Sequence, residues 1–117
     1  MDEYLAAARA ALPRILTQLD RNPRSPTYGC ATRAFWHDRT QSFPNGAAQA
    51  CAAALALASE ADGGIPPYAG SAQVAQWAGA ALAYWASIQR RDGSFDEAYP
   101  GQRSYCATAF SSLGAAL

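Results

Sequence analysis

Apolar residues recur at helical spacing in four segments of the chain. Between about residues 2 and 19, leucine, isoleucine and alanine fall at positions i, i+3, i+4 and i+7, which predicts a helix with one apolar face. Pro13 lies inside this pattern and removes a backbone hydrogen bond, so we expect the helix to bend there. The second segment, about 46–59, is mostly alanine and follows a capping residue at Asn45. Because it carries little side-chain bulk on any face, we expect this helix to lie inside the assembly, packed on several neighbours.

The third segment, about 71–91, has the clearest apolar stripe. Residues on one face of the helix form it: Val74, Trp77, Ala81, Trp85 and Ile88. Ser71 is placed to cap the beginning of the helix, and Arg90 and Arg91 suit the negative end of its dipole. The Asp-Gly pair that follows is a stop signal, since glycine readily adopts the left-handed conformation found just past a helix end.

The fourth segment begins near Arg103 and runs to the last residue without a stop signal. It carries Phe110, Leu113 and Leu117 at helical spacing. In two stacked hairpins no neighbour covers this stripe, so we expect it to be open and the chain to belong to a larger helical array. Exposed apolar area of that kind favours an interface, so self-association through this edge is a further expectation.

Together the four segments predict an all-α fold in a single helical domain over residues 1–117. The chain also repeats weakly at an offset of about 55 residues: Phe43-Pro44 leads into one small-residue helix and Tyr99-Pro100 into another. Repeated helical hairpins bury their faces by stacking on one another. We therefore expect helical hairpins of a partial (α/α) toroid, with about four helices.

Polar and aromatic residues gather in two of the three connectors between these segments. Residues 21–45 and 92–102 carry most of them, whereas residues 61–70 form a Gly/Pro loop with little chemistry. A connector of about 25 residues is uncommon in a compact domain and is more often functional than not. If the helices alternate in direction, the first and third connectors emerge at the same end and touch each other. We expect residues 61–70 at the other end, and at this end His37 together with an acid of the third connector: Asp92, Asp96 or Glu97.

The composition excludes several classes of function. The chain has nine acidic and nine basic residues, and all nine basic residues are arginine, so its net charge is zero. It therefore lacks the basic face of a nucleic-acid-binding protein. No apolar run reaches the roughly 18 residues of a membrane span. The N-terminus is acidic where a signal peptide is positive, which favours a cytoplasmic location.

Cysteine and histidine are too few and too scattered for a metal centre. Cys30, Cys51 and Cys106 match neither a disulfide framework nor the paired spacing of a zinc site. We expect them to be small buried side chains in a reducing compartment. His37 is the single histidine, and the sequence contains no glycine-rich phosphate loop or nucleophile elbow, so we expect no metal and no cofactor.

Two blocks of the sequence resemble heparinase II/III-like proteins. The first runs from SPTYGC at 25–30 to FWH at 35–37, and the second covers residues 89–100. The resemblance extends over most of the chain, from Asp20 onward. It implies the N-terminal (α/α) toroid of a polysaccharide-active protein, and thus a carbohydrate-associated domain that forms one rim of a cleft for an acidic polysaccharide or oligosaccharide. In this family a β-rich domain helps to form the active cleft, so a lyase-like activity would need parts outside this chain.

Residues that suit a polysaccharide lyase lie in the two polar connectors. Such an enzyme needs a base beside the uronate carboxylate, cationic donors for the developing enolate, and aromatic platforms for sugar rings. For catalysis the matching residues are His37, Tyr28 and Tyr99; for substrate binding they are Arg33, Trp36, Arg39, Asp96, Glu97, Arg103 and Tyr105. Structural roles stay open for the same side chains, namely packing of the long loop, ion pairs between the loops, and capping of helices by the acids.

A second resemblance competes with the first. QRRDGSF at 89–95 is similar to the Q-x-x-D-G-x-W repeat of terpene cyclases, whose barrels are also α/α toroids, with Phe95 in place of the usual tryptophan. The acidic motifs of those active sites have no counterpart in this chain. Two alternatives to the glycan-binding rim therefore remain. One is a terpene-cyclase-like or prenyltransferase-like toroid fragment, and the other is a non-catalytic helical interaction module whose open edge meets another chain.

Overall fold

The computed structural model describes residues 2–31, 46–96 and 101–117. These ranges contain four α-helices and one 3₁₀ turn: α1 (Asp2–Gln18), η1 (Ala47–Ala50), α2 (Cys51–Ser59), α3 (Ala72–Ser87) and α4 (Tyr105–Ala116). Outside the helices, β-type pairing in the same ranges amounts to two isolated bridges. The predicted all-α fold is thus confirmed.

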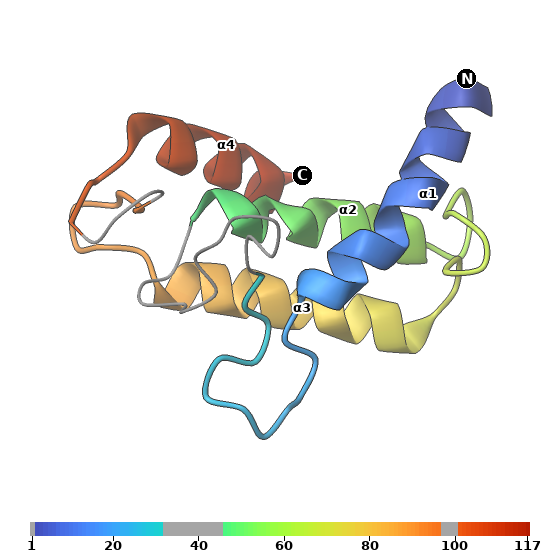
Figure 1. The fold of residues 1–117 in the computed structure, drawn as a ribbon, viewed down its shortest axis with the longest axis horizontal. Helices are drawn as coiled ribbons and strands as arrows, with labels where there is room; N and C mark the ends of the chain where they lie inside the picture. The colour runs from blue at the N-terminus through green and yellow to red at the C-terminus, as the bar shows by residue number, and fades with distance from the viewer. Residues whose placement is uncertain (1, 32–45, 97–100) are drawn as a thin grey trace.

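α2 and α3 form the centre of the molecule. They run side by side in opposite directions, with α4 on the other side of α2 and α1 crossing the layer (Figure 1). Leu55, Ala58 and Ala81 are fully buried in the core that these helices share. Alanine lets two helices approach closely because no bulky side chain separates their backbones. The alanine-rich second segment therefore lies inside the assembly, as its composition predicts.

α1 joins the core with its second half. Leu12 is buried there, and so is Leu19 directly after the helix, whereas Tyr4 and Leu5 near the N-terminus are exposed. Figure 1 shows the first turns of α1 running away from the other helices. The apolar face predicted for this helix is therefore only half buried, because its first turns have no neighbour among the described residues. The helix continues through Pro13, which is itself exposed.

α3 buries the stripe that its periodicity predicts. Val74, Ala78 and Ala81 are buried in the core, and Trp77 packs half-buried against it. Ser71 caps the helix, because its side-chain oxygen accepts a hydrogen bond from the N–H of Val74 at 3.2 Å. The beginning and the buried face of α3 are thus both as predicted.

The end of α3 differs from the prediction. The helix ends at Ser87, so Arg90 and Arg91 do not lie in its last turn. The hydroxyl of Ser87 donates to the carbonyl of Tyr84 at 2.6 Å, a local bond that competes with continuation of the helix. The chain then turns through Gly93, whose φ of +87° is the left-handed conformation expected of the stop residue. The two arginines therefore stand on a turn instead of a helix.

α4 leaves its apolar stripe open, as predicted. Phe110, Leu113 and Leu117 are 66%, 60% and 81% exposed. An adjacent face of the helix carries small residues, including Gly114, and packs on η1. Because small side chains allow the closest approach, that face is the one in contact, and the bulky side chains are left toward solvent. The helix begins at Tyr105, slightly later than the sequence pattern indicates.

The three cysteines do not share one environment. Cys30 is buried, as expected, and Cys51 is half-buried at the beginning of α2. Burial raises the pKa of the Cys51 thiol to about 11. Cys106 is exposed in the first turn of α4, so the expectation of a buried side chain is wrong there. The reason is that α4 packs on its neighbours through another face.

Two of the connectors lie at opposite ends of the helical layer, while the described part of the first connector, residues 20–31, packs against the middle of α3. Residues 61–70 follow α2 at one end, and residues 88–96 and 101–104 lie beyond α3 at the other (Figure 1). The N–H of Gly46, which directly follows the first connector, donates to the carbonyl of Asp96 at 2.8 Å. The predicted contact between residues 21–45 and 92–102, and the position of His37 beside it, depend mostly on residues outside the described ranges and stay predictions. In the described part of the chain, no helix combines the length and the apolar character needed to cross a membrane.

Candidate functional site

The predicted site residues fall into three groups. One group lies outside the described residues: Arg33, Trp36, His37, Arg39, Glu97 and Tyr99, as does the expected cap Asn45. In a second group, Asp96 and Arg103 meet beyond the end of α3, and Tyr105 follows them along the chain as the first residue of α4. Tyr28 forms the third group by itself, in the loop that follows α1. The structure therefore brings together part of the predicted substrate-binding set, and the catalytic roles of His37 and Tyr99 stay predictions.

The QRRDGSF segment forms a compact turn after α3. The side-chain amide of Gln89 donates to the carbonyl of Gly93 at 3.1 Å. Asp92 Oδ1 accepts hydrogen bonds from the N–H and the hydroxyl of Ser94, at 3.0 and 2.6 Å. The backbone N–H of Arg90 donates to the carbonyl of Ser94 at 3.0 Å. Polar residues at these short spacings thus close the turn on itself.

Phe95 fastens this turn to both α3 and α4. Its ring is fully buried and stacks on Trp85 of α3, with ring centroids 5.0 Å apart. Its N–H donates to Thr108 Oγ1 in α4 at 3.0 Å, and its carbonyl accepts a bond from the N–H of Ser104 at 2.7 Å. A Cβ added at Gly46 would collide with the Phe95 side chain, so this residue also meets the chain just before η1. The turn and both helices therefore form one unit.

Asp96 is the anchor of the site. Its carboxylate accepts hydrogen bonds from Nε and Nη2 of Arg90 at 3.1 and 2.7 Å, and from the backbone N–H groups of Gly101 and Arg103, both at 3.0 Å. The two-pronged bond from Arg90 holds the pKa of this carboxyl well below its usual range; burial opposes the shift, and the two backbone bonds add to it. With four donors on a buried carboxylate, Asp96 supports the neighbouring arginines and has little capacity left for a ligand.

Arg103 is held in an uncommon backbone conformation. Its φ of +53° lies in the left-handed region, and the bond from its N–H to Asp96 keeps it there. Its side chain is 63% exposed, and Nη1 lies 3.6 Å from Oδ2 of Asp92. The hydroxyl and the N–H of Ser94 lower the pKa of Asp92, and the charge of Arg103 acts in the same direction. Because the two charged atoms are farther apart than in a charge-assisted hydrogen bond, this ion pair is weak.

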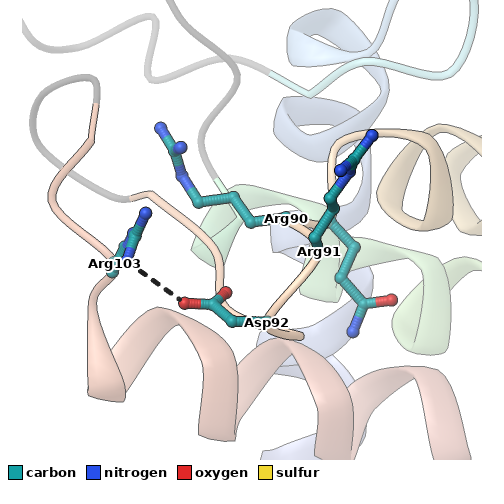
Figure 2. Close-up of a pocket in the computed structure, with 5 residues that line it drawn as sticks. Arg90, Arg91, Asp92 and Arg103 are labelled. Carbon is teal, nitrogen blue, oxygen red and sulfur yellow. Dashed lines mark ion pairs between the residues drawn. The ribbon is translucent and has the colours of Figure 1, made fainter.

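These side chains surround a hollow of about 450 Å³, here named the arginine hollow. Its lining consists of Gln89, Arg90, Arg91, Asp92 and Arg103. Figure 2 shows the arginines coming from two segments, the turn after α3 and the residues just before α4. The lining contains three guanidinium groups and one carboxylate, and the carboxylate of Asp96 also binds Arg90, so the described residues leave a small local excess of positive charge. Arginine does not give up its proton, so the described lining is suited to holding an anion and not to acid–base catalysis.

Tyr28 belongs to a different part of the molecule. Asp20 closes the loop that carries it, because its carboxylate accepts bonds from the hydroxyls of Ser25 and Thr27 at 2.6 and 2.7 Å and from a backbone N–H at 3.1 Å. Burial disfavours the charged form of Asp20, but these bonds outweigh it and lower its pKa. Gly29, with φ of +89°, brings this loop against the middle of α3. Within the described structure no hydrogen bond or ion pair joins Tyr28 to the arginine hollow.

Sequence reasoning did not identify most of the lining of the hollow. It assigned Arg90 and Arg91 to the last turn of a helix, and Asp92 to a stop signal and to the acids expected near His37. Gln89 entered only as part of the two family resemblances. A usable signal was present, because two adjacent arginines stand directly before an Asp-Gly turn. If the helix ends before such a pair, both positive charges are displayed on a loop.

Comparison with known proteins adds no family to this picture. No protein-family model, curated protein or solved structure matches the chain. The likeness to heparinase II/III-like proteins and to terpene cyclases therefore rests on the sequence blocks alone. In the structure, the described part of the second block, residues 89–96, has a local explanation: the turn closes on itself, Phe95 stacks on its neighbour and Asp96 anchors the arginines.

Proposed function

We propose that this chain is a carbohydrate-associated helical domain that binds an acidic glycan at the arginine hollow, as one rim of a glycan cleft. The observation that carries the proposal is that Arg91 and Arg103 stand exposed on segments anchored by Asp96. The ring of Tyr105, which is 86% exposed, follows Arg103 closely along the chain at the beginning of α4. Cations beside an aromatic ring suit a uronate or a sulfated sugar.

Arginine suits the carboxylates and sulfates of glycans for a geometric reason. Its planar fork donates two parallel N–H bonds to two oxygens of one group. An exposed tyrosine ring adds an apolar face against which the C–H groups of a sugar ring pack. Because the turn is held in place before binding, less conformational entropy is lost when the ligand arrives. The chain has no net charge, so this attraction is local to the hollow.

A lyase-like reaction is a further part of the proposal. It requires a base that removes the proton next to the uronate carboxylate, and His37 and Tyr99 are the residues proposed for that role. Tyr28 is the weakest of the three catalytic candidates, because its loop packs on the middle of α3. The terpene-cyclase-like alternative requires an apolar cavity for an isoprenoid chain, and the charged lining of the hollow favours an anionic sugar over it.

Replacing Arg103 by glutamine is expected to weaken binding of an acidic oligosaccharide about fivefold or more, which corresponds to the loss of roughly one charge-assisted hydrogen bond at an exposed site. Glutamine keeps a polar side chain and the same backbone preferences, so the left-handed conformation is no more strained than before. Isothermal titration calorimetry with a galacturonate oligosaccharide checks the result. Low ionic strength is needed, because salt screens charges at the surface.

Two comparisons make this experiment specific. Arg9→Gln, in the exposed first half of α1, changes the net charge equally and should bind like the unaltered protein. A neutral oligosaccharide of the same length should bind much more weakly than the acidic one. Equal binding by the Arg103→Gln variant, or equal binding of the neutral sugar, contradicts the proposed function.

A second candidate function, self-association, rests on the open face of α4. A groove of about 410 Å³ runs between α2, α3 and α4 and is lined mostly by alanine and glycine. Leu117, the last residue of the exposed stripe, lines this space, and Phe110 and Leu113 are exposed on the same helix. A second copy of the chain carries both features, so two copies related by a two-fold axis offer each other a stripe and a groove. We therefore propose a second copy as the occupant of this face.

Replacing Phe110 and Leu113 together by serine is expected to weaken self-association at least about tenfold, because each side chain loses apolar area that the contact would bury. Sedimentation velocity over a range of protein concentrations measures the change. Tyr4→Ser at the exposed beginning of α1 serves as the control and should leave association unaltered. A protein that is monomeric at every concentration, before any substitution, rules out this second candidate.

A further inference from the structure

The ion pair between Asp92 and Arg103 points to a control built into the arginine hollow. We propose, on the basis of the function proposed above, that Asp92 is an internal competitor: its carboxylate occupies Arg103 in the free protein, and an anionic group of the ligand binds by taking Arg103 from it. Asp92 is thus a determinant of affinity and not a group that holds the ligand.

The two carboxylate oxygens of Asp92 make different contacts. Oδ1 accepts hydrogen bonds from both the N–H and the hydroxyl of Ser94, at 3.0 and 2.6 Å, which fixes the position of the carboxylate. Oδ2 faces Nη1 of Arg103 across the hollow at 3.6 Å, and Figure 2 shows this contact between the turn after α3 and the segment before α4. One oxygen is therefore committed to the turn, while the other engages the arginine only loosely.

The same turn contains a tight ion pair, which makes the contrast informative. Arg90 binds Asp96 through two nitrogens, one of them at 2.7 Å, and that carboxylate is buried. In the Asp92–Arg103 pair, by comparison, the two side chains are 49% and 63% exposed and meet only at 3.6 Å. A single exposed pair at that distance contributes little to stability. A ligand can therefore displace Asp92 from Arg103, whereas displacing Asp96 from Arg90 would disrupt the turn.

This arrangement has a consequence for affinity. Because Ser94 holds Asp92 in place, the carboxylate stays beside the hollow after Arg103 has turned to the ligand, and its negative charge then repels the bound anion. Removing that charge should tighten binding. In the alternative interpretation Asp92 orients Arg103 for the ligand, and removing the charge of Asp92 should then weaken binding. The direction of the change therefore decides between them.

The ligand chemistry required by the hollow is an oxyanion with at least two accessible oxygens. The carboxylate of a uronate and the sulfate of a sulfated sugar both meet this requirement, and Arg91 supplies a second cation on the wall of the hollow for either. A galacturonate trisaccharide and a sulfated disaccharide derived from heparin are suitable probes for the two sources.

The test compares the unaltered protein with Asp92→Asn, using both probes in calorimetric titrations at low salt. We expect the variant to bind at least one probe about threefold more tightly or better, the effect of removing one exposed charge next to the site. Asparagine keeps a side-chain oxygen that accepts the bonds from Ser94, so the turn is retained. Asp92→Ser is a second neutral variant that also keeps an acceptor. Asp62→Asn, in the loop at the opposite end of the helical layer, removes the same charge and should bind like the unaltered protein (Figure 1).

The outcomes separate this inference from the proposed function. Unchanged or weaker binding by both neutral Asp92 variants overturns the internal competitor. If Arg103→Gln loses affinity in the same experiments, the proposed function survives that result. If neither probe binds the unaltered protein or any variant, both proposals are overturned. A gain confined to one probe identifies whether carboxylate or sulfate is the group that competes with Asp92.

Discussion

Replacing Asp96 by asparagine is expected to lower the free energy of unfolding by about 2 to 3 kcal/mol. The carboxylate accepts four hydrogen bonds, two from Arg90 and one each from the backbone of Gly101 and Arg103. An amide of the same shape has one acceptor oxygen and turns an NH₂ group toward donors that then have no partner. The side chain of Arg90 is partly exposed, so water relieves some of this loss and the effect stays below that of a deeply buried pair.

The same substitution is expected to abolish binding of acidic oligosaccharides at the arginine hollow. Asp96 holds the left-handed backbone of Arg103 through its N–H, so losing the carboxylate releases the segment that carries the exchangeable cation. Urea unfolding followed by circular dichroism measures the stability, and calorimetric titration measures the binding. Asp62→Asn is the matched control, since it removes an exposed carboxylate with no supporting role in the described structure. An unfolding midpoint equal to that of the control would show that the four bonds contribute nothing.

The contribution of Asp96 to stability should also appear in the pH dependence of the free energy of unfolding. The pKa of Asp96 in the folded protein lies below its ordinary value of 3.8, so the carboxylate stabilises the fold fully above that value, and this stability is lost as the pH falls toward the folded-state pKa. We expect the free energy of unfolding to decline below about pH 5, and to decline less steeply in Asp96→Asn. Asp20 and Asp92, whose pKa values are also lowered, keep their share of the slope in the variant.

The stability of this end of the molecule and its proposed chemistry depend on the same contacts. Asp96 holds one arginine tightly and fixes the backbone of another, whose side chain remains exposed. The anchored arginine, Arg90, belongs to the fold, while the side chains of Arg103 and Arg91 are exposed, as the proposed anion binding requires. A surface anion site needs this division, because exposed cations without a rigid frame lose conformational entropy on binding. The frame here is short, and it consists of the turn after α3 and the first residues of α4.

Features set by local periodicity could be predicted from the sequence. The stripe of α3 and its Ser71 cap depend on residues a few positions apart, and the helix forms as expected. The open face of Phe110, Leu113 and Leu117 followed from counting how many helices the chain contains to cover one another. The separation of residues 61–70 from the polar end followed from alternation of the helices (Figure 1).

Features that depend on tertiary contacts between separate segments of the chain could not be predicted. The role of Asp96 requires Gly101 and Arg103 to come back toward it, and no local pattern encodes that return. Leu5 carries the right spacing for burial and is exposed, because periodicity identifies an apolar face without identifying a neighbour for it. Cys106 is exposed for a similar reason, since the choice of packing face in α4 is made by contact with η1. Among the candidate site residues, tertiary contacts thus decided which came together.

Replacing Phe95 by alanine is expected to cause the largest loss of stability in the chain, about 3 to 5 kcal/mol. The ring is fully buried, stacks on Trp85 at 5.0 Å between centroids, and meets the chain at Gly46. Its removal leaves a cavity where the end of α3, the beginning of α4 and the chain before η1 come together. Because these segments also carry the arginine hollow, binding of an acidic oligosaccharide should be lost together with the cooperative packing around Trp85.

Phe110→Ala is the matched control for this last prediction, because it removes the same ring from an exposed position on α4. At a protein concentration too low for the proposed self-association, it should change the unfolding free energy by less than about 1 kcal/mol, as is usual for a surface substitution. Urea unfolding gives both values, and near-ultraviolet circular dichroism reports the packing of the aromatic rings, Trp85 among them. Phe95→Trp, which restores the usual residue of the terpene-cyclase repeat, should still cost about 1 to 3 kcal/mol, since the fully buried site has no room for the larger ring. If Phe95→Ala unfolds at the same urea concentration as Phe110→Ala, the turn is not fastened through this ring, and the rigid frame assigned to the arginine hollow loses its support.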